Sequence, residues 1–236
     1  MEKRDLLFDG KAKQLYTSDD PDMVIILYKD DASAYNGVKR KSIHNKGVFN
    51  NRITEIIYKK LEKEGIKTHF IKRLDDRNQL CKKVNVIPIE FIVRNVVAGT
   101  LARRLDLEEG TILGNTIYEI CYKNDELRDP FINDTHALAL GLVNAEELKV
   151  LYTLTARIND LLIEMFDRIG ITVVDFKVEY GRDKDGNILL ADEISPDTAR
   201  FWDKKTHYKL DKDRFRRDLG NIEEAYKEVL DRLEKE

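Results

Sequence analysis

The chain has 236 residues, enough to bury a sizeable core in one large domain or two small ones. Its 41 basic and 44 acidic side chains nearly balance, which argues against a protein that coats a polyanion and leaves room only for a local basic pocket. Two cysteines are too few for a disulfide framework, and the first residues lack the apolar stretch of a secretory signal. We therefore expect a soluble, cytoplasmic protein that binds neither membranes nor nucleic acid.

The first third of the chain reads as antiparallel strands around one helix. Residues 6–29 predict strand, turn and strand, and residues 66–74 and 79–85 continue the sheet. Between them, apolar side chains at helical spacing predict a helix over 48–64. We expect residues 1–85 to form a small antiparallel lobe.

A short bend inside the first hairpin carries two lysines. Lys11 and Lys13 point the same way if the segment is extended, and Gly10 beside them lets a backbone come close to a ligand. The pattern is compatible with a cover for phosphates, although lysine pairs on hairpins are usually just solvated. It is not a Walker A motif, because Asp5 stands where that motif needs its first glycine.

Residues 86–97 read as a buried strand that contains two charged side chains, Glu90 and Arg94. Charges in such a run are costly unless they are paired or bind a ligand. An ion pair between these two residues, four positions apart on one face, is one alternative. The other is a phosphate or carboxylate site, since Ala98-Gly99-Thr100 follows as the start of a short helix over 101–105.

A long helix over 145–169, with Asn144 as its N-cap, leads into a charged hairpin. On the first strand Asp175, Lys177 and Glu179 share one face, and apolar side chains take the other.

The return of this hairpin predicts a metal site. A turn over 184–187 and a second strand over 188–194 place Asp192 opposite Glu179. Facing carboxylates repel unless a cation lies between them, and such oxygen ligands suit Mg²⁺. The alternative is an exposed hairpin with a solvated acidic face. An EF-hand is excluded, because the acidic turn has glycine in fourth place and isoleucine in twelfth. A final helix over 222–233 is expected outside the core.

Five stretches of the sequence resemble one known family. These stretches are spread over nearly the whole chain and stand in the order found in SAICAR synthetases, the phosphoribosylaminoimidazole-succinocarboxamide synthases. They are GKAKQLY, KGVFNN, PIEFIVRNVVAGT, VVDFKVEYG and DEISPDTARFWD. The resemblance implies an α+β, SAICAR synthase-like fold related to the ATP-grasp and kinase nucleotide-binding architecture. It further implies a small antiparallel lobe over 1–85, a larger α+β lobe over 86–236, and a homodimer.

The same resemblance implies a reaction of de novo purine (IMP) biosynthesis. Members use ATP and Mg²⁺ to join L-aspartate to the carboxylate of carboxyaminoimidazole ribonucleotide (CAIR), giving SAICAR, ADP and phosphate. We expect an acyl phosphate on the path, since a carboxylate is a poor electrophile and phosphoryl transfer activates it. The alternatives are a small-molecule kinase, against which the missing HRD-type loop counts, and a non-catalytic nucleotide- or RNA-binding module.

The resemblance also implies roles for individual residues of this chain. The expected ATP-binding residues are Lys11, Ala12, Lys13, Lys82, Val86 and Lys123, with the adenine hinge at 82–86. The expected substrate-binding residues are Arg94, Thr100, Asp129, Lys177 and Arg200. The expected catalytic residues are Lys177, which would neutralise the reacting carboxylate, Asp175, which would orient it, and Arg94. The expected metal ligands are Glu179 and Asp192.

Two positions depart from the family pattern. Thr100 stands where many members have serine, and it keeps the hydroxyl group. Asn36 stands where some relatives have aspartate, so it brings no charge.

Overall fold

The computed structural model describes residues 1–34 and 37–236. The departure at Asn36 therefore lies outside the described residues. The strands of each sheet pair antiparallel, with helices interspersed along the chain, which confirms the expected α+β class.

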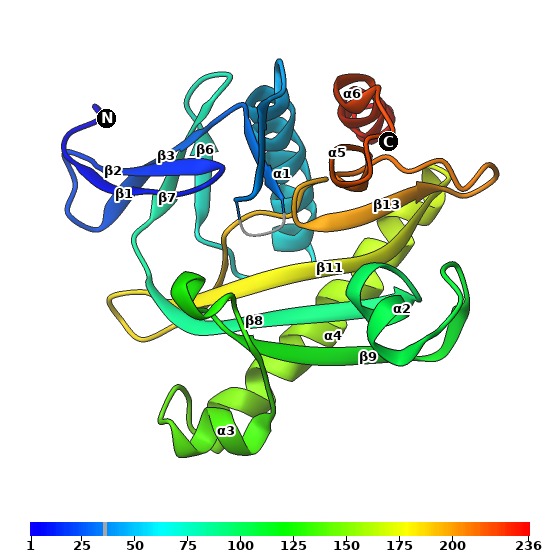
Figure 1. Cartoon of the computed structure of the whole chain (residues 1–236). Helices are drawn as coiled ribbons and strands as arrows, with labels where there is room; N and C mark the ends of the chain where they lie inside the picture. Colours follow the sequence, from blue (N-terminus) through cyan, green and yellow to red (C-terminus); the bar gives the residue numbers. More distant parts are fainter. Residues whose placement is uncertain (35–36) are drawn as a thin grey trace.

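A five-stranded sheet forms the N-terminal part of the molecule, at the upper left of Figure 1. In sheet order its strands are β1 (Leu6–Asp9), β2 (Lys13–Thr17), β3 (Met23–Tyr28), β7 (Asn78–Lys82) and β6 (Phe70–Arg73). A separate pair consists of β4 (Asp31–Ala34) and β5 (Lys39–Ser42). Strand β6 is shorter than predicted, because the N–H of Ile66 still donates to the carbonyl of Leu61 at the end of the preceding helix.

A six-stranded sheet carries Arg94, Asp175, Lys177, Glu179 and Arg200. Its order is β10 (Phe131–Ile132), β9 (Ile112–Tyr122), β8 (Asn85–Val96), β11 (Ile171–Arg182) and β12 (Ile188–Ala191), and β13 (Ala199–Asp203) also pairs with β11. Strand β11 thus has neighbours on both sides along its length, which places its side chains in the middle of the sheet.

Helix α4 (Ala145–Arg168) crosses one face of this sheet (Figure 1). The predicted N-cap is correct: the side chain of Asn144 accepts from the N–H of Glu147 at 2.8 Å, and Glu147 accepts from the N–H of Asn144 at 3.2 Å. The other helices are α1 (Lys46–Lys63), α2 (Gly99–Leu105), α3 (Asp134–Ala139), α5 (Asp213–Arg216), α6 (Ile222–Leu233) and a 3₁₀ turn at Asp125–Leu127.

One hydrophobic core joins α1, α4, α6 and the large sheet, through side chains such as Ile53, Phe91, Phe166 and Tyr226. The expectation that α6 packs outside the core is wrong, because its apolar stripe faces α1, beside which it lies in Figure 1. The division into lobes at 1–85 and 86–236 stays a prediction. Within the described ranges, no helix combines the length and apolar character that crossing a membrane requires.

Candidate active site

Strands β8 and β11 bring two charged pairs face to face in the sheet. Arg94 lies opposite Asp175, and Glu90 lies opposite Glu179. Glu90 accepts from Nζ of Lys177 at 2.9 Å, so the ion pair within β8 between Glu90 and Arg94 is not formed. Residues four apart on an extended strand are separated by about 13 Å, whereas partners on the neighbouring strand are about 5 Å away. The cross-strand partners therefore win.

The predicted register of the β11–β12 hairpin is wrong by one residue. Glu179 faces Ala191 rather than Asp192, because Arg182 pairs with Ile188 at the turn. Strand β12 then ends, and Asp192 adopts a left-handed φ of 61°. This turn returns its carboxylate to the site: Nζ of Lys177 contacts Oε1 of Glu179 and lies 3.5 Å from Oδ2 of Asp192. The two acids meet by a route that strand alternation does not predict.

Three lysines and four acids form what we call the carboxylate–lysine cluster: Lys13, Lys123, Lys177, Glu90, Glu179, Asp192 and Glu193. Lys123 reaches Glu179 at 2.9 Å. Lys13 reaches over from β2, contacts Asp192 and lies 3.0 Å from Glu193. The cluster thus joins residues of both sheets around Lys177.

Burial and ion pairing oppose each other in this cluster. Burial raises the pKa of Asp192, but Lys13 and Lys177 outweigh it and hold the pKa well below its usual range. Burial lowers the pKa of Lys177, yet Glu179 and Asp192 raise it well above the usual value. Burial dominates at Glu90, whose pKa is raised. Asp192 and Lys177 are therefore charged at neutral pH.

The donor chemistry of Glu179 and Asp192 fits Mg²⁺. Both side chains have hard carboxylate oxygens. Both also lie close to one cationic group, the ammonium of Lys177, so a single cation can be within reach of the two acids. Across residues 1–34 and 37–236, no group of three or more His, Cys, Asp or Glu side chains is arranged to hold a metal. Mg²⁺ commonly binds through one or two carboxylates together with phosphates, so a nucleotide would complete the coordination.

Arg94 and Arg200, which we call the arginine pair, share one carboxylate beside this cluster. Nη1 of Arg94 donates to Asp175 at 3.1 Å, and Nη1 of Arg200 donates to it at 2.8 and 3.0 Å. Thr100 accepts from Nη2 of Arg94 at 3.0 Å, so its hydroxyl group lies beside the arginine pair. Burial lowers the pKa of Arg200, but Asp175 and Asp213 raise it above its ordinary value.

The remaining predicted residues lie around these groups. The bend at Gly10 is a tight turn rather than a strand, because the N–H of Gly10 donates to the carbonyl of Lys13. Lys11 therefore does not follow Lys13 to Asp192: its Nζ pairs with Asp125 at 2.6 Å, and it lines a cavity of about 530 Å³. The carbonyl of Ala12 accepts from the N–H of Lys29.

Three further predicted residues lie at strand ends or in a loop. Lys82 ends β7, and Val86, near the start of β8, is exposed. Asp129 accepts from the N–H of Asn124 at 2.9 Å in the loop after Lys123.

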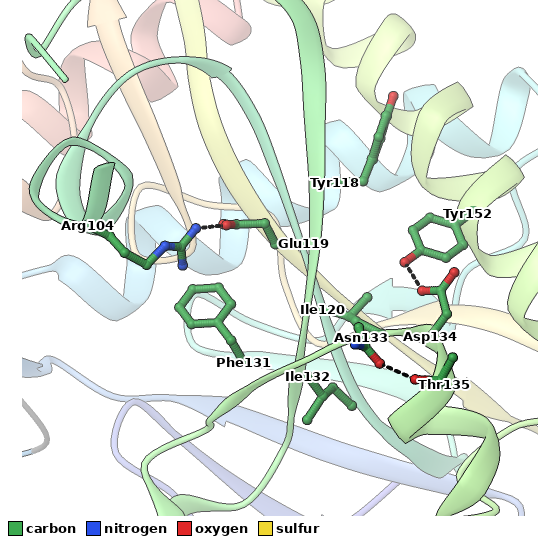
Figure 2. A pocket seen from close by; sticks show the side chains of 10 residues that line it. All are labelled: Arg104, Tyr118, Glu119, Ile120, Phe131, Ile132, Asn133, Asp134, Thr135 and Tyr152. Carbon is green, nitrogen blue, oxygen red and sulfur yellow. Dashed lines mark hydrogen bonds and ion pairs between the residues drawn. The ribbon is translucent and has the colours of Figure 1, made fainter. Parts of the chain in front are cut away.

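Several charged residues at the site were not predicted from the sequence. Glu119 and Asp213 hold the arginine pair from outside, and Glu193 binds Lys13. Figure 2 shows Glu119 in the wall of a cavity of about 640 Å³, facing Arg104 above Phe131. Glu119 had a weak signal, because it is the one charge in the apolar stretch from Ile117 to Tyr122.

Known proteins match this chain over nearly its full length. A family model described as SAICAR synthetase matches residues 6–233. A phosphoribosylaminoimidazole-succinocarboxamide synthase of Fusobacterium nucleatum subsp. nucleatum is 62% identical over 233 residues, 99% of this chain and 98% of that protein. The crystal structure of the synthase from Ehrlichia chaffeensis has a TM-score of 0.96 at 44% identity and covers 98% of both chains. A SAICAR synthetase (Type-2) in complex with ADP has a TM-score of 0.94 at 46% identity and covers 98% of both chains.

Proposed function

Since the chain belongs to the SAICAR synthetase family of purine-biosynthesis ligases, we propose that it joins L-aspartate to the carboxylate of CAIR, with ATP as the energy source. One observation supports this best. A single face of β11 presents Asp175 to the arginine pair and Lys177 and Glu179 to the carboxylate–lysine cluster. A site for a phosphorylated acid and a site for nucleotide phosphates therefore adjoin.

The arginine pair and Thr100 would bind the ribonucleotide phosphate, and Asp129 would lie at the pocket edge. Arginine suits this role because its planar fork matches phosphate oxygens. With the phosphate held there, the imidazole carboxylate would lie beside Lys177, whose ammonium group neutralises it, and Asp175 would orient it.

ATP would bind between the lobes 1–85 and 86–236, with adenine at 82–86. Lys11, Ala12 and Lys13 would cover its phosphates, and Lys123 would lie at their edge. The ADP bound to a relative supports this use of a nucleotide. Mg²⁺ held by Glu179 and Asp192 would neutralise phosphate charge when bound.

The reaction would proceed in two displacements. A carboxylate oxygen of CAIR attacks the γ-phosphorus, the bond from phosphorus to the bridging oxygen breaks, and ADP leaves with that electron pair. The amine of aspartate then attacks the acyl carbon, phosphate leaves, and the nitrogen gives up a proton to water. Lys13 and Lys177 stay protonated throughout, so their part is positioning and charge neutralisation.

Omission of single substrates tests the proposal. ADP and SAICAR should form only when ATP, Mg²⁺, CAIR and L-aspartate are all present. ADP formed equally fast without the amino acid would indicate a kinase or ATPase instead. CAIR labelled with oxygen-18 in its carboxylate should pass label into the released phosphate, and unlabelled phosphate would exclude the acyl phosphate.

Substitution of Arg200 tests which substrate the arginine pair binds. Arg200→Ala should raise the KM for CAIR and leave that for ATP unchanged. Arg232→Ala serves as the control, because it removes an arginine that pairs with Asp203 at the end of the same strand and with Glu228, outside the site. A change in the KM for ATP alone would show that Arg200 binds ATP and not CAIR.

We also propose that the protein forms a homodimer, which sedimentation equilibrium can test.

A further inference from the structure

The two guanidinium groups of the arginine pair are held in the same way. Nε of Arg94 donates to Glu119 at 2.5 Å, and Nε of Arg200 donates to Asp213 at 2.8 Å. On the inner side both Nη1 groups donate to Asp175. Because the guanidinium group is planar and rigid, two such contacts fix its orientation in the plane.

The Nη2 groups converge on one place at the start of α2. Nη2 of Arg94 donates to Thr100, and the guanidinium of Arg200 lies directly against Gly99. A Cβ on Gly99 would lie 2.6 Å from Cζ of Arg200, so a larger residue there would force the guanidinium group to move. The two arginines therefore approach Gly99 and Thr100 together.

Each outer carboxylate also holds a second arginine. Glu119 pairs with Arg104, drawn as a dashed line in Figure 2, and Asp213 accepts from Arg216 at 2.6 Å. The result is a row of alternating charge that runs Arg104, Glu119, Arg94, Asp175, Arg200, Asp213, Arg216. Four guanidinium groups against three carboxylates leave one positive charge in excess within the row.

The two central arginines of the row are more buried than the two at its ends. The side chains of Arg94 and Arg200 are 3% and 15% exposed, against 39% and 30% for Arg104 and Arg216. Burial raises the pKa of Asp213, but its arginine partners outweigh burial and lower the value to about 2, so the carboxylate is ionised near neutral pH.

We propose that Glu119 and Asp213 are positioning residues, which hold Arg94 and Arg200 by their Nε groups so that both Nη2 ends meet one phosphate monoester beside Gly99 and Thr100. This role rests on the proposed function, which assigns the ribonucleotide to the arginine pair. Neither acid touches the phosphate, and each acts through the arginine that it holds.

The sign of one measurement separates positioning from simple electrostatics. If Glu119 and Asp213 acted only through their charge, Glu119→Gln and Asp213→Asn would remove negative charge near an anion site and tighten CAIR binding. If they position the arginines, the same variants release them, and the KM and the calorimetric Kd for CAIR rise about tenfold or more. The KM for ATP should stay within about twofold of the parent value.

Glu55→Gln is the matched control for loss of a buried carboxylate. Glu55 is 7% exposed at its side chain and holds Arg52, Arg73 and Lys59 away from the row, so its variant should lose stability without a change in either KM. Glu119→Asp and Asp213→Glu keep the charge, and they should recover part of the affinity. They also serve as the second test if the neutral variants do not fold.

The outcomes separate this inference from the function on which it rests. If Arg200→Ala leaves CAIR binding intact, the arginine pair does not bind the ribonucleotide and both proposals fail. If Arg200→Ala weakens CAIR binding but Glu119→Gln and Asp213→Asn leave it unchanged or tighter, positioning alone is overturned.

Discussion

Lys13 on β2 and Asp192 after β12 form an ion pair that joins the five-stranded sheet to the six-stranded sheet. Lys13 also lies 3.0 Å from Glu193, whose side chain is almost fully buried. One lysine thus compensates two carboxylates at the point where the proposed ATP site and the proposed metal site meet.

Replacement of this lysine should reduce both stability and ATP binding. Lys13→Met keeps the aliphatic stem but leaves two carboxylates short of a cation, which costs about 3–5 kcal/mol when a buried pair is broken. The KM for ATP should rise about tenfold or more, since the phosphates lose a direct countercharge. Urea unfolding and steady-state kinetics measure the two effects.

Lys29→Met is the control for Lys13→Met. Lys29 also pairs with two acids, Asp9 and Asp31, but both of these are largely exposed. We expect a loss of at most about 1 kcal/mol for such a pair. Equal losses in the two variants would contradict the role given to Lys13.

Neutralisation of either proposed metal ligand should strongly reduce turnover without unfolding the protein. Glu179→Gln and Asp192→Asn each remove one oxygen anion, and we expect kcat to fall about 100-fold or more. Asparagine tolerates the left-handed backbone of Asp192, so the turn should persist. The apparent Mg²⁺ requirement, measured at saturating ATP, should rise in both variants. An unchanged rate would refute the assignment.

Local signals in the sequence predicted the scaffold well. The N-cap at Asn144, the long helix that follows it and the strand that carries Asp175, Lys177 and Glu179 are each encoded by short stretches of sequence, and the structure shows each of them. The family was recognisable for a similar reason, because its motifs are long, contiguous stretches.

The site depends on contacts that no local pattern encodes. Arg94 meets Asp175 from 81 residues away, and Lys13 meets Asp192 from 179 residues away. The predicted hairpin register was wrong by one residue, and the left-handed backbone at Asp192, rather than strand alternation, returns its carboxylate to the site. Glu119 and Asp213 were not predicted, because their proposed role depends on the arginines that they hold and these are distant in the sequence.

Substitution of Gly99 should act on CAIR alone. Gly99→Ala places a methyl group against the guanidinium of Arg200 at a position with φ of 55°, so the arginine must move away from Asp175 or Asp213. We expect the KM for CAIR to rise about tenfold or more while that for ATP stays constant. Gly186→Ala introduces similar backbone strain, at φ of 79°, with open space around the new Cβ. It should cost stability only, and equal kinetics in the two variants would show that the contact with Arg200 is unimportant.

The stability of the fold should depend on pH through His69. Its side chain is buried with Nε2 3.2 Å from the carbonyl oxygen of Asp192, and burial together with Lys13 lowers its pKa from 6.5 to about 4. Between these values the unfolded chain binds a proton that the folded protein does not, so stability is lost as pH falls, by at most about 3 kcal/mol. His69→Gln removes this dependence, and its urea midpoint should fall less than that of the parent between about pH 7 and pH 4.5. His44→Gln, at an exposed histidine, should keep the parent slope. Parallel curves for the parent and His69→Gln would show that His69 is protonated in the folded protein as readily as in the unfolded chain.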